Sequence, residues 1–152
     1  MAHTENARMF SKRLLYAKII HLAQKFKDYE TMYFPLQLDF RGRAYAVPAF
    51  LNYQSIGGAK ALLSFSHGKP ITKKNKGDYW LAIHGANQYG EDKISFADRI
   101  KWTKDNESWI IDCGTDPMLH RQWEKASNPF QFLSFCDEWK RFKEQGYGFV
   151  SN

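Results

Sequence analysis

Large aromatic side chains recur at helical spacing between positions 128 and 146, and this pattern constrains the fold more than any other stretch. The spacing i, i+3, i+7, i+10 places them on one side of an α-helix. A side with so much apolar surface is expected to be buried. Asn128 suits the N-cap position, Pro129 the first helical position and Gly146 the C-cap. Cys136 falls on the same side and is expected in the core. The sequence therefore predicts a buried helix with the apolar side Phe132, Phe135, Trp139 and Phe142.

Further helices are predicted over much of the chain. Residues 5–27 carry apolar side chains at helical spacing, with Thr4 as the expected N-cap and basic side chains on the other sides. We favour a solvated surface for these basic side chains, with a nucleic-acid contact as the alternative. The later helices, with the residues expected to begin or end them, are 79–87 (Asp78, Gly90), 96–104 (Ser95 with Asp98) and 107–113 (Gly114).

The region between the first predicted helix and the later ones is predicted to contain strand instead of helix. Residues 31–48 are β-prone. Pro35 confines the first part to an edge or a bend, and strand is expected from Asp39 to Val47. A bent ribbon or hairpin is therefore predicted. Residues 52–58 are rich in turn formers and predict a loop. We therefore expect an α+β fold that is mainly helical, with a small β ribbon.

The stretch Asp-Phe-Arg-Gly-Arg-Ala-Tyr, Asp39 to Tyr45, is the part of the chain best suited to bind a ligand. In an extended strand Arg41, Arg43 and Tyr45 would share one face, because strand side chains alternate. Gly42 would then leave the opposite side open to another backbone or a ligand. Two guanidinium groups and a phenol ring suit a nucleic-acid backbone and a base. A hairpin whose arginines are merely solvated or paired with carboxylates fits these residues equally well. Asp39 could be the structural partner of an arginine or could bind an ion.

Composition narrows the class of protein. The 152 residues carry a net charge of +6, which favours anionic partners, and 43% hydrophobic residues, which excludes a disordered tail. Cys113 and Cys136 form no CxxC pair, so a reduced, cytosolic chain is the default interpretation. No apolar signal sequence follows Met1, and the apolar runs fall far short of the ~18 residues that a membrane span needs. No arrangement of His, Cys, Ser or carboxylate residues predicts a complete catalytic centre or a metal site.

At Asp39-Phe40-Arg41-Gly42-Arg43 the chain resembles the single-subunit DNA-directed RNA polymerases of bacteriophages and their mitochondrial relatives, through their DxxGR signature. Other stretches resemble the same family in the same order, so the resemblance runs from about Ser11 to the last residue. They are Tyr33-Phe34-Pro35, Ala44-Tyr45, Gly68-Lys69-Pro70, Trp80 to Asn87, Gly90 to Lys93, Phe96 to Ile100, Asn128-Pro129-Phe130, Phe135-Cys136 and Val150-Ser151-Asn152.

This resemblance implies a piece of a right-hand polymerase. Residues 1–30 would be the end of the thumb, 31–65 the first part of the palm, 66–145 a helical palm insertion, and 146–152 the lead-in to the catalytic strand. The family uses two aspartates that hold Mg²⁺, and the first is expected a few residues beyond this chain. We therefore expect no catalytic residue and no metal ligand within it, and no activity of the chain alone. We also expect Phe149 and Val150 to pack against palm strands outside it.

The resemblance also implies contacts with nucleic acid. Arg43 would contact the template–product hybrid, Arg41 would support the motif, and Tyr45 would lie against the template or the first base pairs. Lys60 matches a family lysine near the start of the nascent transcript. The expected partners are a DNA template, an RNA–DNA hybrid, nucleoside triphosphates and the remaining polymerase chain, with no membrane. The expected location is the cytoplasm, that of an infected host cell for a phage protein, with the mitochondrial matrix second. The alternatives are a stand-alone basic nucleic-acid-binding module without catalysis, and a purely structural helical domain.

Overall fold

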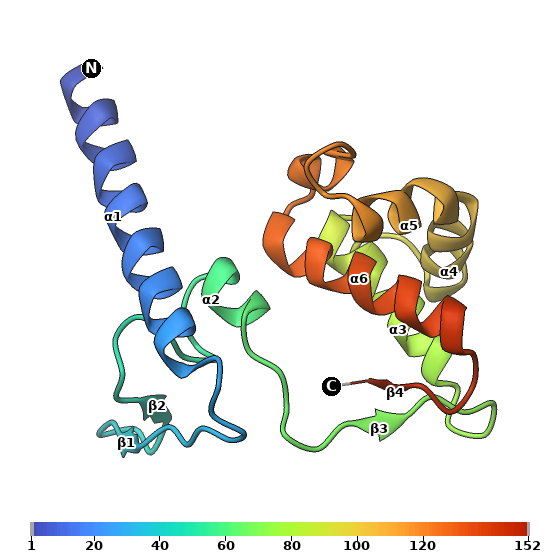
Figure 1. The fold of residues 1–152 in the computed structure, drawn as a ribbon, viewed down its shortest axis with the longest axis horizontal. Helices are drawn as coiled ribbons and strands as arrows, with labels where there is room; N and C mark the ends of the chain where they lie inside the picture. The colour runs from blue at the N-terminus through green and yellow to red at the C-terminus, as the bar shows by residue number, and fades with distance from the viewer. Residues whose placement is uncertain (1, 152) are drawn as a thin grey trace. The chain divides into compact units, whose positions relative to one another are not determined.

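The computed structural model describes residues 2–151, which divide into two compact units. The N-terminal unit ends at Leu63 and the C-terminal unit begins at Ser64 (Figure 1). Each unit has its own core of buried side chains. Helices account for most of the regular structure, and the strands form short antiparallel pairs. The predicted α+β, mainly helical fold is therefore confirmed.

The N-terminal unit is built on one long helix, α1 (Ala2–Phe26). Its apolar side buries Ile19 against Leu51 and Ala59. The residues that flank this small core are Leu15, Leu22, Ala23, Phe50 and Leu63. The helix predicted over 5–27 is confirmed. Its apolar side chains are not confined to one side, because Leu14 and Ile20 are about half exposed. Thr4 lies inside α1 and is not its N-cap.

A hairpin and a short helix complete the N-terminal unit. Strand β1 (Leu36–Leu38) pairs antiparallel with β2 (Ala44–Ala46), so the predicted ribbon is a hairpin. The continuous strand expected from Asp39 to Val47 is wrong, because a turn separates the two strands. Helix α2 (Gly57–Ala61) begins within the stretch predicted as loop and supplies the buried Ala59 to the core.

The C-terminal unit is mainly helical. Its elements are β3 (Lys69–Pro70), α3 (Gly77–Tyr89), α4 (Phe96–Asp105), α5 (Glu107–Thr115), η1 (Gln122–Lys125), α6 (Pro129–Gln145) and β4 (Val150–Ser151). Helix α6 lies against α3 and α5, and α4 packs on α3 (Figure 1). The buried Thr103 of α4 donates a 2.9 Å hydrogen bond to the carbonyl of Ala82 in α3, which joins these two helices.

The predicted aromatic side of α6 is buried. Phe132, Phe135, Trp139 and Phe142 are each at most 7% exposed, and neighbouring rings along the helix lie 5.7 Å apart between centroids. Cys136 is in the same core, as predicted. Large aromatic side chains dominate apolar burial in small domains, so α6 is the element on which the C-terminal unit is assembled.

Two glycines explain how closely the helices approach α6. A Cβ atom on Gly85 of α3 would lie 2.2 Å from the Phe135 ring, and one on Gly114 of α5 would lie 2.5 Å from the carbonyl oxygen of Cys136. Gly114 was expected to end its helix, but α5 continues to Thr115. Its role is therefore close packing of α5 on α6, and not helix termination.

The beginning of α3 also differs from the prediction. Asp78 lies in the first turn, and Lys76 holds the N-cap position in a left-handed conformation. The Asn75 side chain organises this turn, because its Oδ1 accepts hydrogen bonds from the backbone N–H groups of Thr72 and Gly77. By contrast, Ser95 caps α4 through Asp98 as predicted, and Gly90 ends α3 at φ 127°.

The two ends of the C-terminal unit meet in a second strand pair. Strand β4 pairs antiparallel with β3, and the N–H of Ile71 donates to the carbonyl of Phe149 at 2.7 Å. Phe149 is only 7% exposed and belongs to the core of this unit. The expectation of packing against strands outside the chain is therefore wrong for Phe149, because its packing partners lie within the chain. Val150 is 48% exposed, so for this residue the expectation stays a prediction.

Candidate nucleic-acid interface

The DxxGR motif forms the turn of the hairpin. The N–H of Asp39 donates to the carbonyl of Arg43 at 2.9 Å, and the N–H of Gly42 donates to the carbonyl of Asp39 at 3.0 Å. Gly42 has φ +75°, a conformation that residues with a Cβ rarely adopt. Arg41 consequently lies in the turn, while Arg43 directly precedes β2, so the two arginines do not alternate along one strand.

The carboxylate of Asp39 holds the backbone of both arginines. Its Oδ1 accepts hydrogen bonds from the N–H of Arg41 at 2.8 Å and of Arg43 at 2.9 Å. Among the described residues no ion pair includes either guanidinium group. Asp39 therefore shapes the turn through the main chain and leaves the charged ends of both arginines available to a ligand.

The side chains of the hairpin that were predicted to bind nucleic acid are exposed. Arg43 and Tyr45 stand two positions apart, so they share one face of the hairpin, and Tyr45 keeps 41% of its surface exposed. The Arg41 guanidinium lies 5.1 Å from the centroid of the Phe40 ring, itself 91% exposed. The three residues predicted as binding groups thus come together at one end of the hairpin.

The backbone conformation explains why glycine occupies position 42. A Cβ atom at this position would meet nothing within 4 Å, so no neighbouring backbone approaches it. The positive φ angle favours glycine here. The close approach of a neighbouring backbone is not found among the described residues, and the close approach of a ligand at Gly42 stays a prediction.

The sequence reasoning missed the residue that supports the outer edge of β2. The Gln54 side chain donates to the carbonyl of Ala44 at 2.9 Å and accepts from the N–H of Ala46 at 2.7 Å. Asn52, 6% exposed, accepts from the N–H of Gln54 and donates to the carbonyl of Pro48. The signal in the sequence was two amide side chains in the loop after the strand. These amides fix Tyr45, which lies between Ala44 and Ala46.

Lys60 comes from another element. It lies on α2, next to the buried Ala59, and its own side chain is exposed. The hairpin brings Arg41, Arg43 and Tyr45 together, whereas Lys60 is the one predicted site residue outside it. The N-terminal unit therefore offers an exposed cationic and aromatic hairpin and a separate exposed lysine.

Within residues 2–151 no group of three or more His, Cys, Asp or Glu side chains is arranged to hold a metal ion. No helix in the same range is long and apolar enough to cross a membrane.

Comparison with known proteins identifies the family of this basic, mainly helical chain. A family model described as DNA-dependent RNA polymerase matches residues 71–152, which is more than half of the chain. The chain therefore belongs to the DNA-dependent RNA polymerase family.

The individual relatives are the phage-type enzymes and their mitochondrial counterparts. The chain is 39% identical to T7 RNA polymerase of Escherichia phage T7 over 139 residues, which covers 91% of this chain and 15% of that protein. It is 38% identical to the mitochondrial DNA-directed RNA polymerase 1 of Arabidopsis thaliana over 135 residues, 87% of this chain and 14% of the relative. The identity to the mitochondrial polymerase of Schizosaccharomyces pombe is 40% over 120 residues, 78% of this chain and 10% of the relative. The resemblance found in the sequence is confirmed, and the chain spans about 15% of the length of the first of these relatives.

Proposed function

We propose that this chain acts as part of a phage-type RNA polymerase and supplies contacts to the DNA template and the RNA–DNA hybrid. The observation that carries the proposal is the hairpin, which exposes Arg43 and Tyr45 on one face and leaves both guanidinium groups without a carboxylate partner among the described residues. Membership of the polymerase family supports nucleic acid as the ligand.

Each residue would have a separate role. Arg43 presents a planar fork to backbone phosphates, and Arg41 supplies a second positive charge at the turn. Tyr45 offers a ring on which a base can stack, and Lys60 offers a mobile point charge to the transcript. Such contacts are insensitive to base sequence, because phosphates carry no sequence information. This property suits an enzyme that copies any template.

The role of the whole polymerase is part of the same proposal. The complete enzyme would join nucleoside triphosphates into RNA with Mg²⁺, in the cytoplasm of an infected host cell if it is a phage protein. Residues 1–30 would end the thumb, 31–65 would begin the palm, 66–145 would form the palm insertion and 146–152 would lead to the catalytic strand.

Binding to an RNA–DNA hybrid tests the role of the hairpin. We expect the full chain to bind a short hybrid, and Arg43→Ala to weaken this binding and to lower the slope of log affinity against log salt by about one unit. Arg121→Ala is the matched control, because it removes the same charge from an exposed ion pair with Glu124. Equal losses in the two variants would contradict a specific role for Arg43.

A stand-alone binding module remains the second candidate, because the hairpin is exposed within the N-terminal unit itself. The two candidates are separated by a chimera in which this chain replaces the matching segment of T7 RNA polymerase. The polymerase proposal expects a chimera that transcribes, with activity that falls when Arg43→Ala is introduced. A chimera that folds, binds the hybrid and makes no RNA would favour the stand-alone module.

A further inference from the structure

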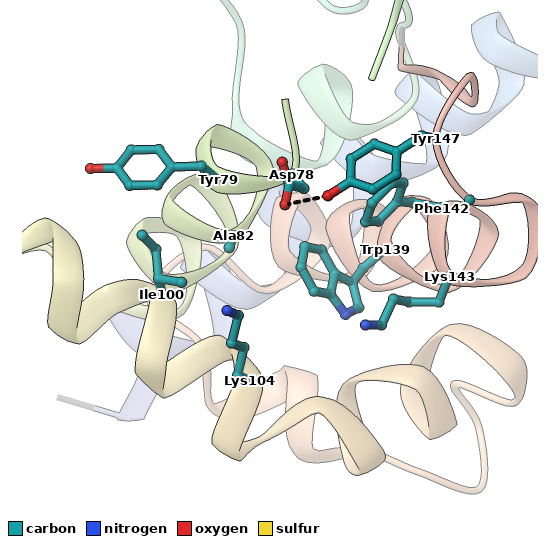
Figure 2. Close-up of a pocket in the computed structure, with 10 residues that line it drawn as sticks. Asp78, Tyr79, Ala82, Ile100, Lys104, Trp139, Phe142, Lys143 and Tyr147 are labelled. Atoms are coloured by element: carbon teal, nitrogen blue, oxygen red, sulfur yellow. Dashed lines mark hydrogen bonds between the residues drawn. The ribbon is translucent and has the colours of Figure 1, made fainter. Parts of the chain in front are cut away.

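A hollow of about 400 Å³ opens on the C-terminal unit between α3, α4 and α6 (Figure 2). This volume is within the range of small-molecule sites. Its lining includes the buried Ala82 and Trp139 and the half-exposed Tyr147. The hollow thus combines buried apolar side chains with an accessible aromatic ring.

Two lysines from different helices reach this hollow. Figure 2 shows Lys104 of α4 and Lys143 of α6 extending toward Trp139 from opposite sides. The Lys143 Nζ lies 5.5 Å from the centroid of the Trp139 ring and 2.7 Å from Oε1 of Glu107. Lys104 is exposed and forms no ion pair with any of residues 2–151. One positive charge is therefore uncompensated, and the other has a single carboxylate partner.

A third lysine lies beside the aromatic ring of the hollow. The Lys73 Nζ is 5.5 Å from the centroid of the Tyr147 ring. The Tyr147 hydroxyl donates a 3.1 Å hydrogen bond to Oδ2 of Asp78, which fixes the ring and occupies part of that carboxylate. Among the residues that line the hollow, Lys104 and Lys143 are positively charged and Asp78 is negatively charged, so the lining itself carries one net positive charge.

We propose that this hollow binds a nucleoside phosphate, with the phosphate between Lys104 and Lys143 and the base against the ring of Tyr147. Ammonium groups donate to phosphate oxygens as mobile point charges, and an exposed tyrosine is a stacking surface for any base. The chemistry is the same for a free nucleotide and for one nucleotide of a single strand. This site uses none of the hairpin residues, so it does not depend on the function proposed for them.

The test uses the full chain with Arg41→Ala and Arg43→Ala, which removes the guanidinium groups of the hairpin. Backbone amide spectra are recorded during titration with adenosine monophosphate, inorganic phosphate, adenosine and a single-stranded oligoadenylate RNA. We expect saturable shifts at Lys104, Lys143 and Tyr147 with the monophosphate, and weaker binding of phosphate or adenosine alone. Tighter binding of the oligonucleotide would identify a strand as the natural source of the nucleotide, and equal affinity would identify a free nucleotide.

Side-chain variants sharpen the test. Lys104→Ala should weaken binding about fivefold, as expected for one solvated lysine–phosphate contact. Lys101→Ala, a change of the same charge on an exposed side chain of the same helix that does not line the hollow, should have no effect. Glu107→Gln should tighten binding, because it frees Lys143 while an amide oxygen can still accept from the Trp139 Nε1.

Three outcomes would overturn the proposal. The first is a titration that leaves the three amides unmoved with every ligand. The second is equal weakening by Lys104→Ala and Lys101→Ala, which would indicate a general charge effect. The third is equal affinity for phosphate and for the monophosphate, which would remove the role of Tyr147. None of these results bears on Arg43, so this proposal and that of the hairpin can fail separately.

Discussion

Asp39 and Arg43 close the hairpin turn through two hydrogen bonds of 2.9 Å, one from each residue's backbone N–H. The N–H of Asp39 donates to the carbonyl of Arg43, and the N–H of Arg43 donates to Oδ1 of Asp39. The same carboxylate oxygen accepts from Arg41. The acid of the motif thus acts on the backbone, and the two guanidinium groups remain outside the turn.

Replacing Asp39 with alanine should loosen this turn. The variant leaves the N–H groups of Arg41 and Arg43 without their acceptor, a loss of about 1–2 kcal/mol of local stability. Amide hydrogen exchange should therefore accelerate at both arginines. Asp39→Asn keeps an acceptor oxygen and should recover most of the protection, and Asp28→Ala, on an exposed residue outside the hairpin, should change neither amide. Unchanged exchange in Asp39→Ala would contradict the assignment.

Gly42 provides a second test of the turn. Its φ of +75° disfavours any residue with a Cβ, although the surrounding space is open. Gly42→Ala should destabilise the hairpin by about 1 kcal/mol, and Gly42→Asn should cost less, because asparagine visits the left-handed region more readily. Hydrogen exchange at the Asp39 amide, which is bonded across the turn, reports the difference. Equal protection in both variants and in the parent would refute this role.

The parts of the fold that the sequence predicted well depend on local signals. The caps at Ser95 and Gly146 and the aromatic spacing from Phe132 to Phe142 act within one helix, so neighbours in the chain suffice to find them. The bent ribbon or hairpin over 31–48 was predicted for the same reason. The turn between its strands was missed, because alternation of side chains was assumed to continue through Gly42.

The parts that were missed depend on residues far apart in the chain. Phe149 is buried because β4 pairs with β3, and Gly114 is required by the carbonyl of Cys136 on another helix. In the candidate site, Arg41, Arg43 and Tyr45 could be predicted to lie near one another because they are close in sequence. Gln54 reaches the edge of β2 across a loop, and only the folded structure gives that contact.

The approach of α3 to α6 predicts a strong effect at Gly85. A Cβ atom there would lie 2.2 Å from the buried Phe135 ring, so Gly85→Ala should destabilise the C-terminal unit by about 1–3 kcal/mol. The double variant Gly85→Ala/Phe135→Leu should recover part of the lost stability, because the smaller leucine side chain leaves room for the added Cβ atom. Denaturant unfolding of the two single variants and the double variant measures the coupling. Additive losses would show that the ring is not the cause.

The two cysteines of the C-terminal unit give a pH-dependent prediction. Burial raises the pKa of the Cys136 thiol far above its ordinary value, and burial also raises the pKa of Cys113. Both thiols should stay protonated and resist a thiol reagent at pH 8 until the unit unfolds, since the thiolate is the reactive form.

Above about pH 8.5 the unfolded thiols ionise while the folded ones do not. The unfolded state then binds fewer protons, so the free energy of unfolding should fall as pH rises. Denaturant unfolding with Cys136→Ala as the comparison isolates this term. Rapid labelling of the folded chain at pH 8 would contradict it.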